Sequence, residues 1–504
     1  MSGPFVVEND SSYFSYQNLY HHYISCRKNK RNTYNALRFE AHQEKQLLNL
    51  CETLSNRSYK PKPSVCFINK QPKLREIFAA DFRDRVVHHV LIDYLETIWE
   101  PIFIHDSYAC RRGKGVHQGV KRLQQFIHKI TLNGQRRAWY LQLDIKNYFM
   151  RIDKSILWQQ LAPKINHADM FWLTELLVFH DCTENYIFRG NPSELKNIPK
   201  HKSLLTSPAN KGLPIGNLNS QFFANVYLNA LDQFVKHQLK CNYYLRYCDD
   251  FILLANSSKQ LQQWQQQISN FLQQTLLLEL NPSRERLKPV SDGIDFLGYI
   301  VRRKYMLVRK RVINHLQIKL QAFEKELVSV ENSVIYYRYN EERLNSLHAT
   351  LSSYLGHFKM ASTYKLWQSI WNRFAFLKQY FYYNEKTKKL QRKYLVPKQL
   401  NTVRQQYHFF RCLFPDDVLF FQVGKYFEFY HKLQEPVLKL LNLVPIQKSS
   451  RGLFYGFPMT LQQDKISLLL KADFSVIIIA QLGNYISRIK QRLPLVRSVR
   501  LRLS

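Results

Sequence analysis

Three aspartates stand where two apolar stretches of the chain end or turn. Asp144 closes the alternating stretch WYLQLDI (139–145), and the pair Asp249–Asp250 sits at the centre of YYLRYCDDFILLA (243–255). Two neighbouring aspartates repel each other unless a cation lies between them. Magnesium prefers carboxylate oxygens, and nucleotidyl transfer uses two divalent cations roughly 3.5–4 Å apart. The pattern therefore suits a two-metal site for nucleotidyl transfer. An ordinary acidic turn is the alternative reading of the Asp249–Asp250 hairpin alone.

Strands are expected to position these aspartates. The alternation of 139–145 predicts one strand, and 243–255 predicts a hairpin with the acidic pair in its turn. Helices are predicted at 35–60, 81–99 and 311–382, and the Gln-rich stretch 259–274 keeps apolar residues at helical spacing. Strands in the first part and helices later predict an α+β fold.

The composition points to a polyanionic partner. The chain has 504 residues, with 73 Lys plus Arg against 38 Asp plus Glu, a formal net charge of +35. A surplus of this size is typical of nucleic-acid-binding proteins, and aromatics at 14% supply faces on which bases can stack.

Membrane attachment and disulfides are not expected. No run reaches the roughly 18 apolar residues of a membrane span, and the start MSGPFVVEND lacks the pattern of a signal peptide. The eight cysteines form no C-x-x-C pair. We therefore expect a cytoplasmic protein in a reducing compartment.

Several blocks of the sequence resemble reverse transcriptases in type and order. Tyr247-Cys248-Asp249-Asp250 is similar to their Y-x-D-D signature, and LDIKNYF at 143–149 resembles their first acidic motif. Further blocks follow the family's order: CRRGKGVHQG (110–119), GLPIGNLNSQFFAN (212–225), LNPSRERL (280–287), FLGY (296–299) and SSYLGHFKMA (352–361). The resemblance implies a right-hand polymerase over 1–385. Fingers and palm would take about 12–310, and a helical thumb about 311–385.

The resemblance also implies site residues and ligands. Asp144, Asp249 and Asp250 would be catalytic and, with Ile145, would hold two Mg²⁺ ions, for which Mn²⁺ can substitute. Charge-assisted contacts to a triphosphate suit basic side chains, and Phe149 falls where the family keeps an aromatic gate against ribose. Expected nucleotide-binding residues are Lys73, Arg75, Arg111, Arg112, Phe149, Ile215 and Gly216. Expected primer or template contacts are Gln221, Tyr247, Phe296, Leu297 and Gly298.

One block narrows the type of reverse transcriptase. Many members have Pro-Gln-Gly where this chain has Pro214-Ile215-Gly216. The I-G-N-L-x-S-Q pattern is similar to that of diversity-generating retroelements, with Asn219 where Thr is more usual. That resemblance implies a bacterial or phage-encoded enzyme that copies a template RNA into cDNA from dNTPs, with frequent errors at adenines. An accessory variability protein is a further expected partner. We hypothesise that Ile215, which cannot hydrogen-bond to a base pair, contributes to low fidelity.

The last hundred residues carry a second resemblance. FFQVGKYFEFY (420–430), YGFPMT (455–460) and FSVIIIAQLGN (474–484) resemble the N-terminal mismatch-recognition domain of MutS. Its Phe-x-Glu motif would correspond to Tyr426 and Glu428, and a small α/β module is expected over 403–504 after a basic linker at 386–402. The alternative is that Tyr426 and Glu428 only pack within a domain that contacts protein or RNA. The basic tail 488–504 is either a phosphate contact or a solvated end.

Two other functions remain open. The chain could be a reverse transcriptase of a retron, phage-defence or group II intron lineage, although no endonuclease or maturase-like extension is evident. It could also be a non-catalytic nucleic-acid scaffold, against which the three retained, mutually repelling aspartates argue.

Overall fold

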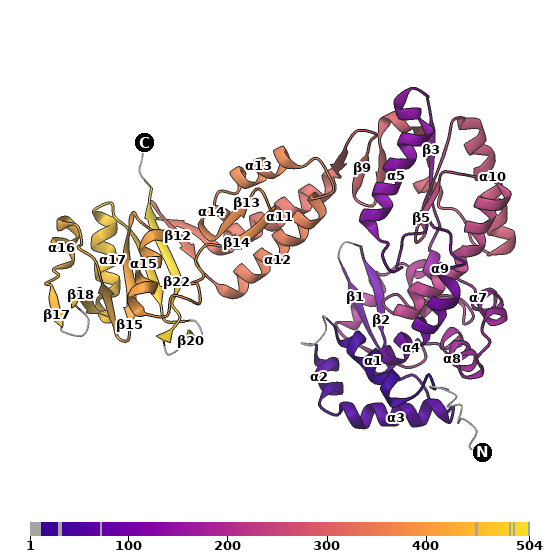
Figure 1. Cartoon of the computed structure of the whole chain (residues 1–504), viewed down its shortest axis with the longest axis horizontal. Coiled ribbons are helices and arrows are strands. Elements are labelled where there is room, and N and C mark those ends of the chain that lie inside the picture. Colours follow the sequence, from indigo (N-terminus) through magenta and orange to yellow (C-terminus); the bar gives the residue numbers. More distant parts are fainter. Residues whose placement is uncertain are drawn as a thin grey trace, which may run out of the picture. The chain divides into compact units, whose positions relative to one another are not determined.

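The computed structural model describes residues 12–28, 33–70, 73–448, 452–482, 485–486 and 489–501 (Figure 1). It contains both helices and strands, as the predicted α+β class requires. The chain forms two compact units: the first takes 1–297 and 301–304, the second 298–300 and 305–504. None of the helices in the described residues is long and apolar enough to cross a membrane.

A four-stranded antiparallel sheet lies in the first unit, in the order β5-β6-β3-β7. Its strands are β3 (Trp139–Asp144), β5 (Tyr244–Tyr247), β6 (Asp250–Ala255) and β7 (Arg286–Pro289). Both predicted strand regions are confirmed. Leu141 and Phe251 belong to the core that α9 (Leu218–Gln233) and α10 (Ser258–Thr275) share, so the Gln-rich stretch is the amphipathic helix that its spacing predicts.

A second sheet of the first unit has the order β2-β1-β4. Here β1 (Ser64–Asn69) runs antiparallel to β2 (Arg75–Ala79) and parallel to β4 (Tyr186–Phe188). The predicted helical region 81–99 is confirmed, whereas 35–60 contains two helices and is not helical after Ser55. The helices of this unit are α1 (Tyr16–Arg27), α2 (Tyr34–Glu40), α3 (Gln43–Ser55), α4 (Phe82–Trp99), α5 (Val116–Ile130), α6 (Tyr148–Arg151), α7 (Lys154–Leu161) and α8 (Ala168–Phe179), besides α9 and α10.

The segment 311–382 is not helical throughout, which corrects the prediction. It contains α11 (Lys310–Leu327), α12 (Glu341–Phe358), α13 (Tyr364–Arg373) and α14 (Leu377–Tyr380), but also the hairpin of β11 (Val328–Glu331) and β12 (Val334–Arg338). The turn residues Asn332 and Ser333 both have positive φ, 47° and 60°. Two such residues form a tight hairpin turn whose twist matches its strands. β-branched residues on both sides of Asn-Ser were the missed signal.

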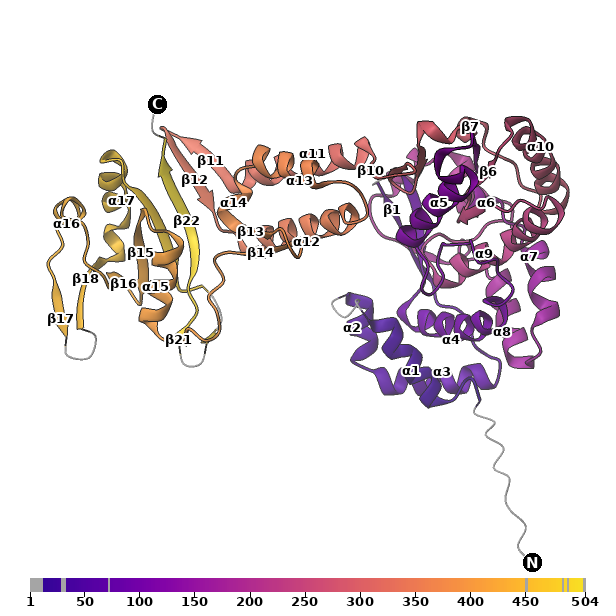
Figure 2. The ribbon, with the colours of Figure 1, turned by 45° about the horizontal axis from the view of Figure 1, so that its top comes forward.

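This hairpin joins a larger sheet in the second unit. Eight strands have the order β11-β12-β22-β19-β15-β16-β18-β17, and β12 pairs with β22 from Val334↔Arg500 to Arg338↔Val496 (Figure 2). The other strands are β15 (Asp417–Val423), β16 (Tyr426–Phe429), β17 (Ile446–Lys448), β18 (Gly452–Pro458), β19 (Ser475–Ala480) and β22 (Leu493–Arg500), with α15 (Val403–Leu413), α16 (Glu435–Leu441) and α17 (Gln462–Lys471). The C-terminal module therefore shares one sheet with the helical segment before it.

The remaining strands are short. They are β8 (Ile294–Phe296), β9 (Tyr299–Val301), β10 (Met306–Val308), β13 (Phe381–Asn384), β14 (Lys389–Arg392), β20 (Tyr485–Ile486) and β21 (Ile489–Lys490). Within 386–402, the predicted basic linker, β14 pairs with β13, and Tyr394 and Val396 are buried. Both ends of this segment lie in the second unit, so it packs inside that unit and does not divide it.

The arginines of the predicted basic tail are largely engaged by the protein itself. Arg492 is buried and donates to the Gln422 carbonyl at 2.7 Å. Arg497 pairs with Asp417 at 2.9 Å, and Arg500 pairs with Asp473 at 3.0 Å. Positions 488 and 502–504 of the tail lie outside the described residues.

We predict that β22 protects β12 from solvent. A chain ending at residue 492 would leave β12 paired only with β11 and open to solvent along its other edge. Amide hydrogen exchange at 334–338 should therefore rise at least tenfold, relative to a control chain ending at residue 500. Equal protection of 334–338 in the two chains would contradict the shared sheet.

Candidate active site

The three aspartates meet at one end of the four-stranded sheet. Asp144 on β3 lies directly opposite Asp250 on β6, and the pair Tyr247↔Asp250 closes the β5–β6 hairpin around Cys248 and Asp249. Cys248 has a left-handed backbone, with φ of 54°, which is uncommon for a residue with a side chain and is found at functional turns. After Asp144 the chain bends at Asn147 (φ 52°) into α6.

Crowding changes the acidity of two of these carboxyls. Burial, and next the nearby Asp144, raises the pKa of Asp249 to about 6. Burial also raises the pKa of Asp250 to about 7, with contributions from Asp144 and Asp249. Since like charges at short range disfavour ionisation, a cation at this end of the sheet would be strongly favoured.

Basic side chains from the β1–β2 region interact electrostatically with the same carboxylates. Burial lowers the pKa of Lys73, and the charges of Arg284 and Arg75 lower it further, whereas Asp144 and Asp249 oppose this shift. The charges of Arg75 and Arg284 in turn lower the pKa of Asp249 against the effect of burial. Lys73 and Arg75, both predicted from the sequence, therefore lie within electrostatic reach of the aspartates.

Three further residues bind the aspartates and were not predicted as site residues. Gln142 donates to the carboxylate of Asp250 at 3.0 and 3.3 Å. Asn281 donates to Asp144 Oδ1 at 2.9 Å, and Arg284 approaches Asp144 Oδ2 at 3.5 Å. Asn281 and Arg284 belong to the block LNPSRERL, whose resemblance to the family was the available signal. Gln142 had none, because its position opposite the hairpin follows only from strand register.

The donor set of the site fits magnesium in its chemistry. Carboxylate oxygens and backbone carbonyls are the ligands that Mg²⁺ prefers, and Asp144, Asp249, Asp250 and the neighbouring Ile145 supply them. In the described part of the chain, no three Asp, Glu, His or Cys side chains stand close enough to hold one ion together. Asn281 and Gln142 hold two of the carboxylates instead, so a metal would replace these hydrogen bonds.

A buried ion pair stabilises the β5–β6 turn that carries Asp249. Arg246 and Asp232 are fully buried, with Nη2 and Oδ2 2.6 Å apart, and Tyr244 donates to Asp232 at 2.7 Å. Arg246 Nη1 also donates to the Cys248 carbonyl at 3.0 Å and to Asn225 at 3.3 Å. One guanidinium therefore ties α9 to the backbone that carries Asp249.

Phe149, Ile215 and Gly216 gather beside β2. Phe149 and Ile215 pack against the same buried cluster, which includes Phe78, and the Ile215 carbonyl accepts from Phe78 N at 3.1 Å. Gly216 has φ of 122°, and a Cβ there would come within 2.8 Å of Ile77 Cγ2. Glycine is therefore required at this close approach, and the surroundings of Ile215 are apolar.

Arg111 and Arg112, predicted to bind nucleotide, are bound to other acidic partners. Arg111 donates to Glu100 at 2.7 Å and to the carbonyls of Ile104 and Ser107, with its side chain 5% exposed. Arg112 pairs with Asp93 and Glu96 at 2.7 and 2.9 Å. Both arginines are thus engaged by acidic residues other than the three aspartates.

The predicted primer and template residues fall into two groups. Gln221 accepts a hydrogen bond from the Cys110 thiol at 3.2 Å, and the thiols of Cys110 and Cys248 are also hydrogen-bonded, which brings Gln221 close to the turn after Tyr247. Phe296 is buried in the first unit, and the neighbouring Leu297 is half-buried with a left-handed backbone, φ 50°. Gly298 begins the second unit, where a Cβ would meet the His357 ring at 3.1 Å.

Comparison with known proteins decides the class of this site. Residues 60–301 match the family model described as reverse transcriptase (RNA-dependent DNA polymerase). Residues 60–301 form a reverse transcriptase domain. The domain is that of an RNA-directed DNA polymerase, and it contains all three aspartates. Residues 401–497 match the family model of MutS domain I.

Curated relatives agree with the reverse transcriptase match. Protein YkfC of Escherichia coli K12 is 23% identical over 333 residues, which cover 59% of this chain and 82% of YkfC. The group II intron-encoded protein LtrA of Lactococcus lactis subsp. cremoris is 24% identical over 382 residues, which cover 62% of this chain and 59% of LtrA. The match thus spans about three fifths of LtrA.

Among solved structures, apo telomerase from Candida tropicalis, truncated from its C-terminal domain, aligns with a TM-score of 0.36. It is 12% identical, and the alignment covers 50% of this chain and 56% of that chain.

The two residues that correspond to the MutS motif differ in their surroundings. Tyr426 opens β16 and is 52% exposed. Glu428, two residues on, is 5% exposed, and its carboxylate accepts a hydrogen bond from the Tyr430 hydroxyl. Tyr426 is therefore open to a ligand, whereas Glu428 would have to leave a buried partner before it could reach one.

We predict that the Asp232–Arg246 pair is essential for the reverse transcriptase domain. Asp232→Asn would leave Arg246 buried without its counter-charge, and removal of one partner of a buried pair costs about 3–5 kcal/mol. Urea unfolding should show this loss, with reduced primer extension. Asp169→Asn, which breaks the exposed Arg57–Asp169 pair, is the control and should cost no more than about 1 kcal/mol. Equal losses in the two variants would contradict the role of the buried pair.

Proposed function

We propose that this chain copies a template RNA into cDNA with an active site built on Asp144, Asp249 and Asp250. The observation that carries the proposal is the meeting of these three carboxylates within a reverse transcriptase domain. A merely structural acidic turn has no reason to keep like charges so close that burial and repulsion raise the pKa of two of them.

Asp144 and Asp249 would hold two Mg²⁺ ions, with Asp250 and the Ile145 carbonyl in support, and Mn²⁺ could take their place. Bound there, the ions would activate the primer 3′-oxygen and stabilise the leaving pyrophosphate. Lys73 and Arg75 would bind the triphosphate of the incoming dNTP, because they lie within electrostatic reach of the aspartates. Phe149 would exclude a ribose 2′-hydroxyl.

The proposed type is the error-prone enzyme of a diversity-generating retroelement. In support, Ile215 stands where many reverse transcriptases have glutamine, and it packs with Phe149 against an apolar cluster. An aliphatic side chain there offers no hydrogen bond with which to test the geometry of a new base pair. Template RNA and cDNA would be the nucleic-acid partners, and an accessory variability protein would assist. The relatives from two bacteria are in keeping with a bacterial or phage origin.

Primer extension on an RNA template with Mg²⁺, followed by sequencing of the cDNA, tests the function. We expect extension with misincorporation concentrated opposite adenines. The double variant Asp249→Ala/Asp250→Ala should extend at least a thousandfold more slowly, because it cannot hold the metals. Ile215→Gln should lower the adenine error rate without abolishing synthesis.

The outcomes separate the parts of this proposal. Faithful extension by the natural chain, or an adenine error rate unchanged by Ile215→Gln, would overturn the mutagenic type but not the polymerase. Extension by the double aspartate variant would overturn the active site itself. If the natural chain extends no primer even with an accessory protein added, the alternative function of a non-catalytic nucleic-acid scaffold is favoured.

A faithful reverse transcriptase of a retron, phage-defence or group II intron-like lineage is the second candidate. The similarity to the intron-encoded protein LtrA favours it. A template repeat and a variable target gene beside the coding sequence would favour the diversity-generating type instead.

For the C-terminal module we propose a contact with mismatched cDNA–RNA duplex or template RNA. The exposed Tyr426 could insert at an unstacked base step, which costs least at a mismatch. We expect the full chain to bind a single-mismatch duplex several-fold more tightly than a matched one, and Tyr426→Ala to abolish the difference. The full chain is required because β12 belongs to the module's sheet. Equal binding of both duplexes would refute mismatch reading.

A further inference from the structure

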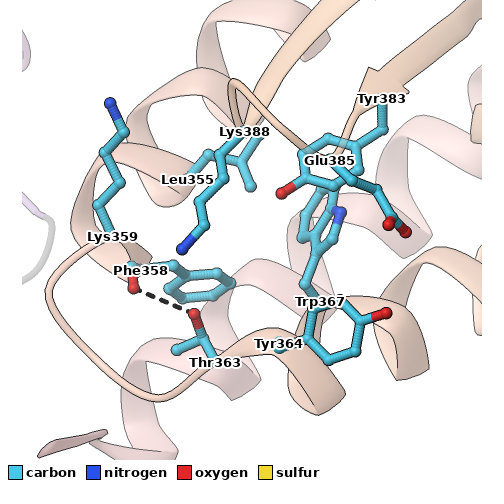
Figure 3. A pocket seen from close by; sticks show the side chains of 9 residues that line it. All are labelled: Leu355, Phe358, Lys359, Thr363, Tyr364, Trp367, Tyr383, Glu385 and Lys388. Atoms are coloured by element: carbon cyan, nitrogen blue, oxygen red, sulfur yellow. Dashed lines mark hydrogen bonds between the residues drawn. The ribbon is translucent and has the colours of Figure 1, made fainter.

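A small, solvent-open hollow of about 50 Å³ lies in the helical segment of the second unit, where the resemblance locates a thumb. Aromatic and charged side chains line it: Tyr364, Trp367, Tyr383, Lys359, Lys388 and Glu385 (Figure 3). No motif in the sequence indicated this site, because its residues come from three separate elements.

The walls of the hollow are held by local contacts. On one side, α12 ends and α13 begins, and Thr363 Oγ1 donates to the Phe358 carbonyl at 3.0 Å across the connecting loop (Figure 3). On the other side is the β13–β14 hairpin, whose turn carries Glu385 and Lys388. The rings of Trp367 and Tyr383 meet at 5.1 Å with a tilt of 50°. The shape of the hollow is thus fixed by contacts among α12, α13 and the β13–β14 hairpin.

The aromatic groups have features that packing alone does not explain. Tyr364 is a large ring left 63% exposed at the mouth. Trp367 is 4% exposed, yet its indole N–H has no hydrogen-bond partner among the described residues. A buried donor without an acceptor is costly, and an acceptor on a bound ligand would satisfy it.

The charged side chains of the hollow suit the phosphate and the base of a nucleotide. Lys359 and Lys388 are exposed and supply the positive charge that a phosphate needs. Glu385 is also exposed, and a carboxylate accepts hydrogen bonds but cannot donate them. It therefore suits the donor edge of a base, and it suits guanine best, because guanine presents two neighbouring donors. Aromatic faces stack on any base.

We propose that this hollow binds one unpaired nucleotide of a nucleic-acid strand, with a preference for guanine. The base stacks over the hollow on the exposed Tyr364 ring and meets Glu385, and its phosphate lies between the two lysines. The strand is held at a point outside the reverse transcriptase domain as matched over 60–301. This inference rests on the proposed polymerase function in one respect: that function identifies the bound strand as template RNA or cDNA.

Photocrosslinking of the full chain tests the site. The probe is a labelled single-stranded 12-mer with one 6-thioguanine, made once as RNA and once as DNA, with Asp249→Ala/Asp250→Ala in the chain and no dNTPs. We expect crosslinks to peptides that contain Tyr364 or Tyr383. The arm that crosslinks more strongly identifies the strand as template or cDNA. Crosslinks confined to other peptides in both arms would overturn the site.

Matched variants measure its contribution to binding. Tyr364→Ala/Lys388→Ala should weaken binding of a G-containing 12-mer in fluorescence anisotropy by about tenfold. Tyr382→Ala/Lys386→Ala removes an exposed ring and a lysine from the same hairpin but outside the hollow, and should leave the affinity unchanged.

Glu385→Gln should remove the preference for guanine over uracil without loss of folding. Equal affinities for the two double variants, with unchanged thermal unfolding, would overturn the proposal.

Neither the crosslinking nor the binding measurement depends on DNA synthesis by the chain. Failure of primer extension with intact crosslinking would remove the proposed polymerase activity and leave the nucleotide site standing.

Discussion

The position of the three clustered aspartates depends on a buried, paired charge. Arg246 lies under the β5–β6 turn, where it is neutralised by Asp232 and reaches up to the Cys248 carbonyl. A buried ion pair adds little net stability compared with apolar residues, but it fixes geometry because neither partner can move away without an unpaired charge. The left-handed backbone of Cys248 is held by this arrangement. The acidic residues above the pair can therefore be crowded, since the turn that carries them cannot relax.

That crowding accounts for the neighbours of the aspartates. Asn281 binds Asp144, and Gln142 binds Asp250, while Lys73 and Arg75 contribute positive charge. Gln142 binds Asp250 as a neutral amide, whereas Asp144 is contacted both by the Asn281 amide and by the Arg284 guanidinium. An amide can be displaced by a cation, whereas a guanidinium competes with it. The three aspartates are therefore held close together by neighbours that compensate their charge.

The second unit shows that the C-terminal module is not simply tethered to the rest of the chain. The β11–β12 hairpin continues the module's sheet through β22, and Arg497 bonds both Asp417 in the module and Gln379 in α14. Backbone pairing along a strand resists relative motion far better than a flexible linker does. A ligand bound at the exposed Tyr426 would thus act on a body that includes the helical segment.

The sequence by itself determined the reverse transcriptase chemistry, the strands that carry Asp144, Asp249 and Asp250, and the amphipathic helix behind them. These follow from short motifs and from periodicity, which depend on residues close together in the chain. Only the tertiary structure decided that Gln142 and Asn281 bind the aspartates, that Arg111 is bound to Glu100, and that β12 joins β22. Strand register, ion pairing and sheet order join residues that are distant in sequence. A local pattern carries no information about which distant partner lies opposite it, because that choice is made when the cores pack.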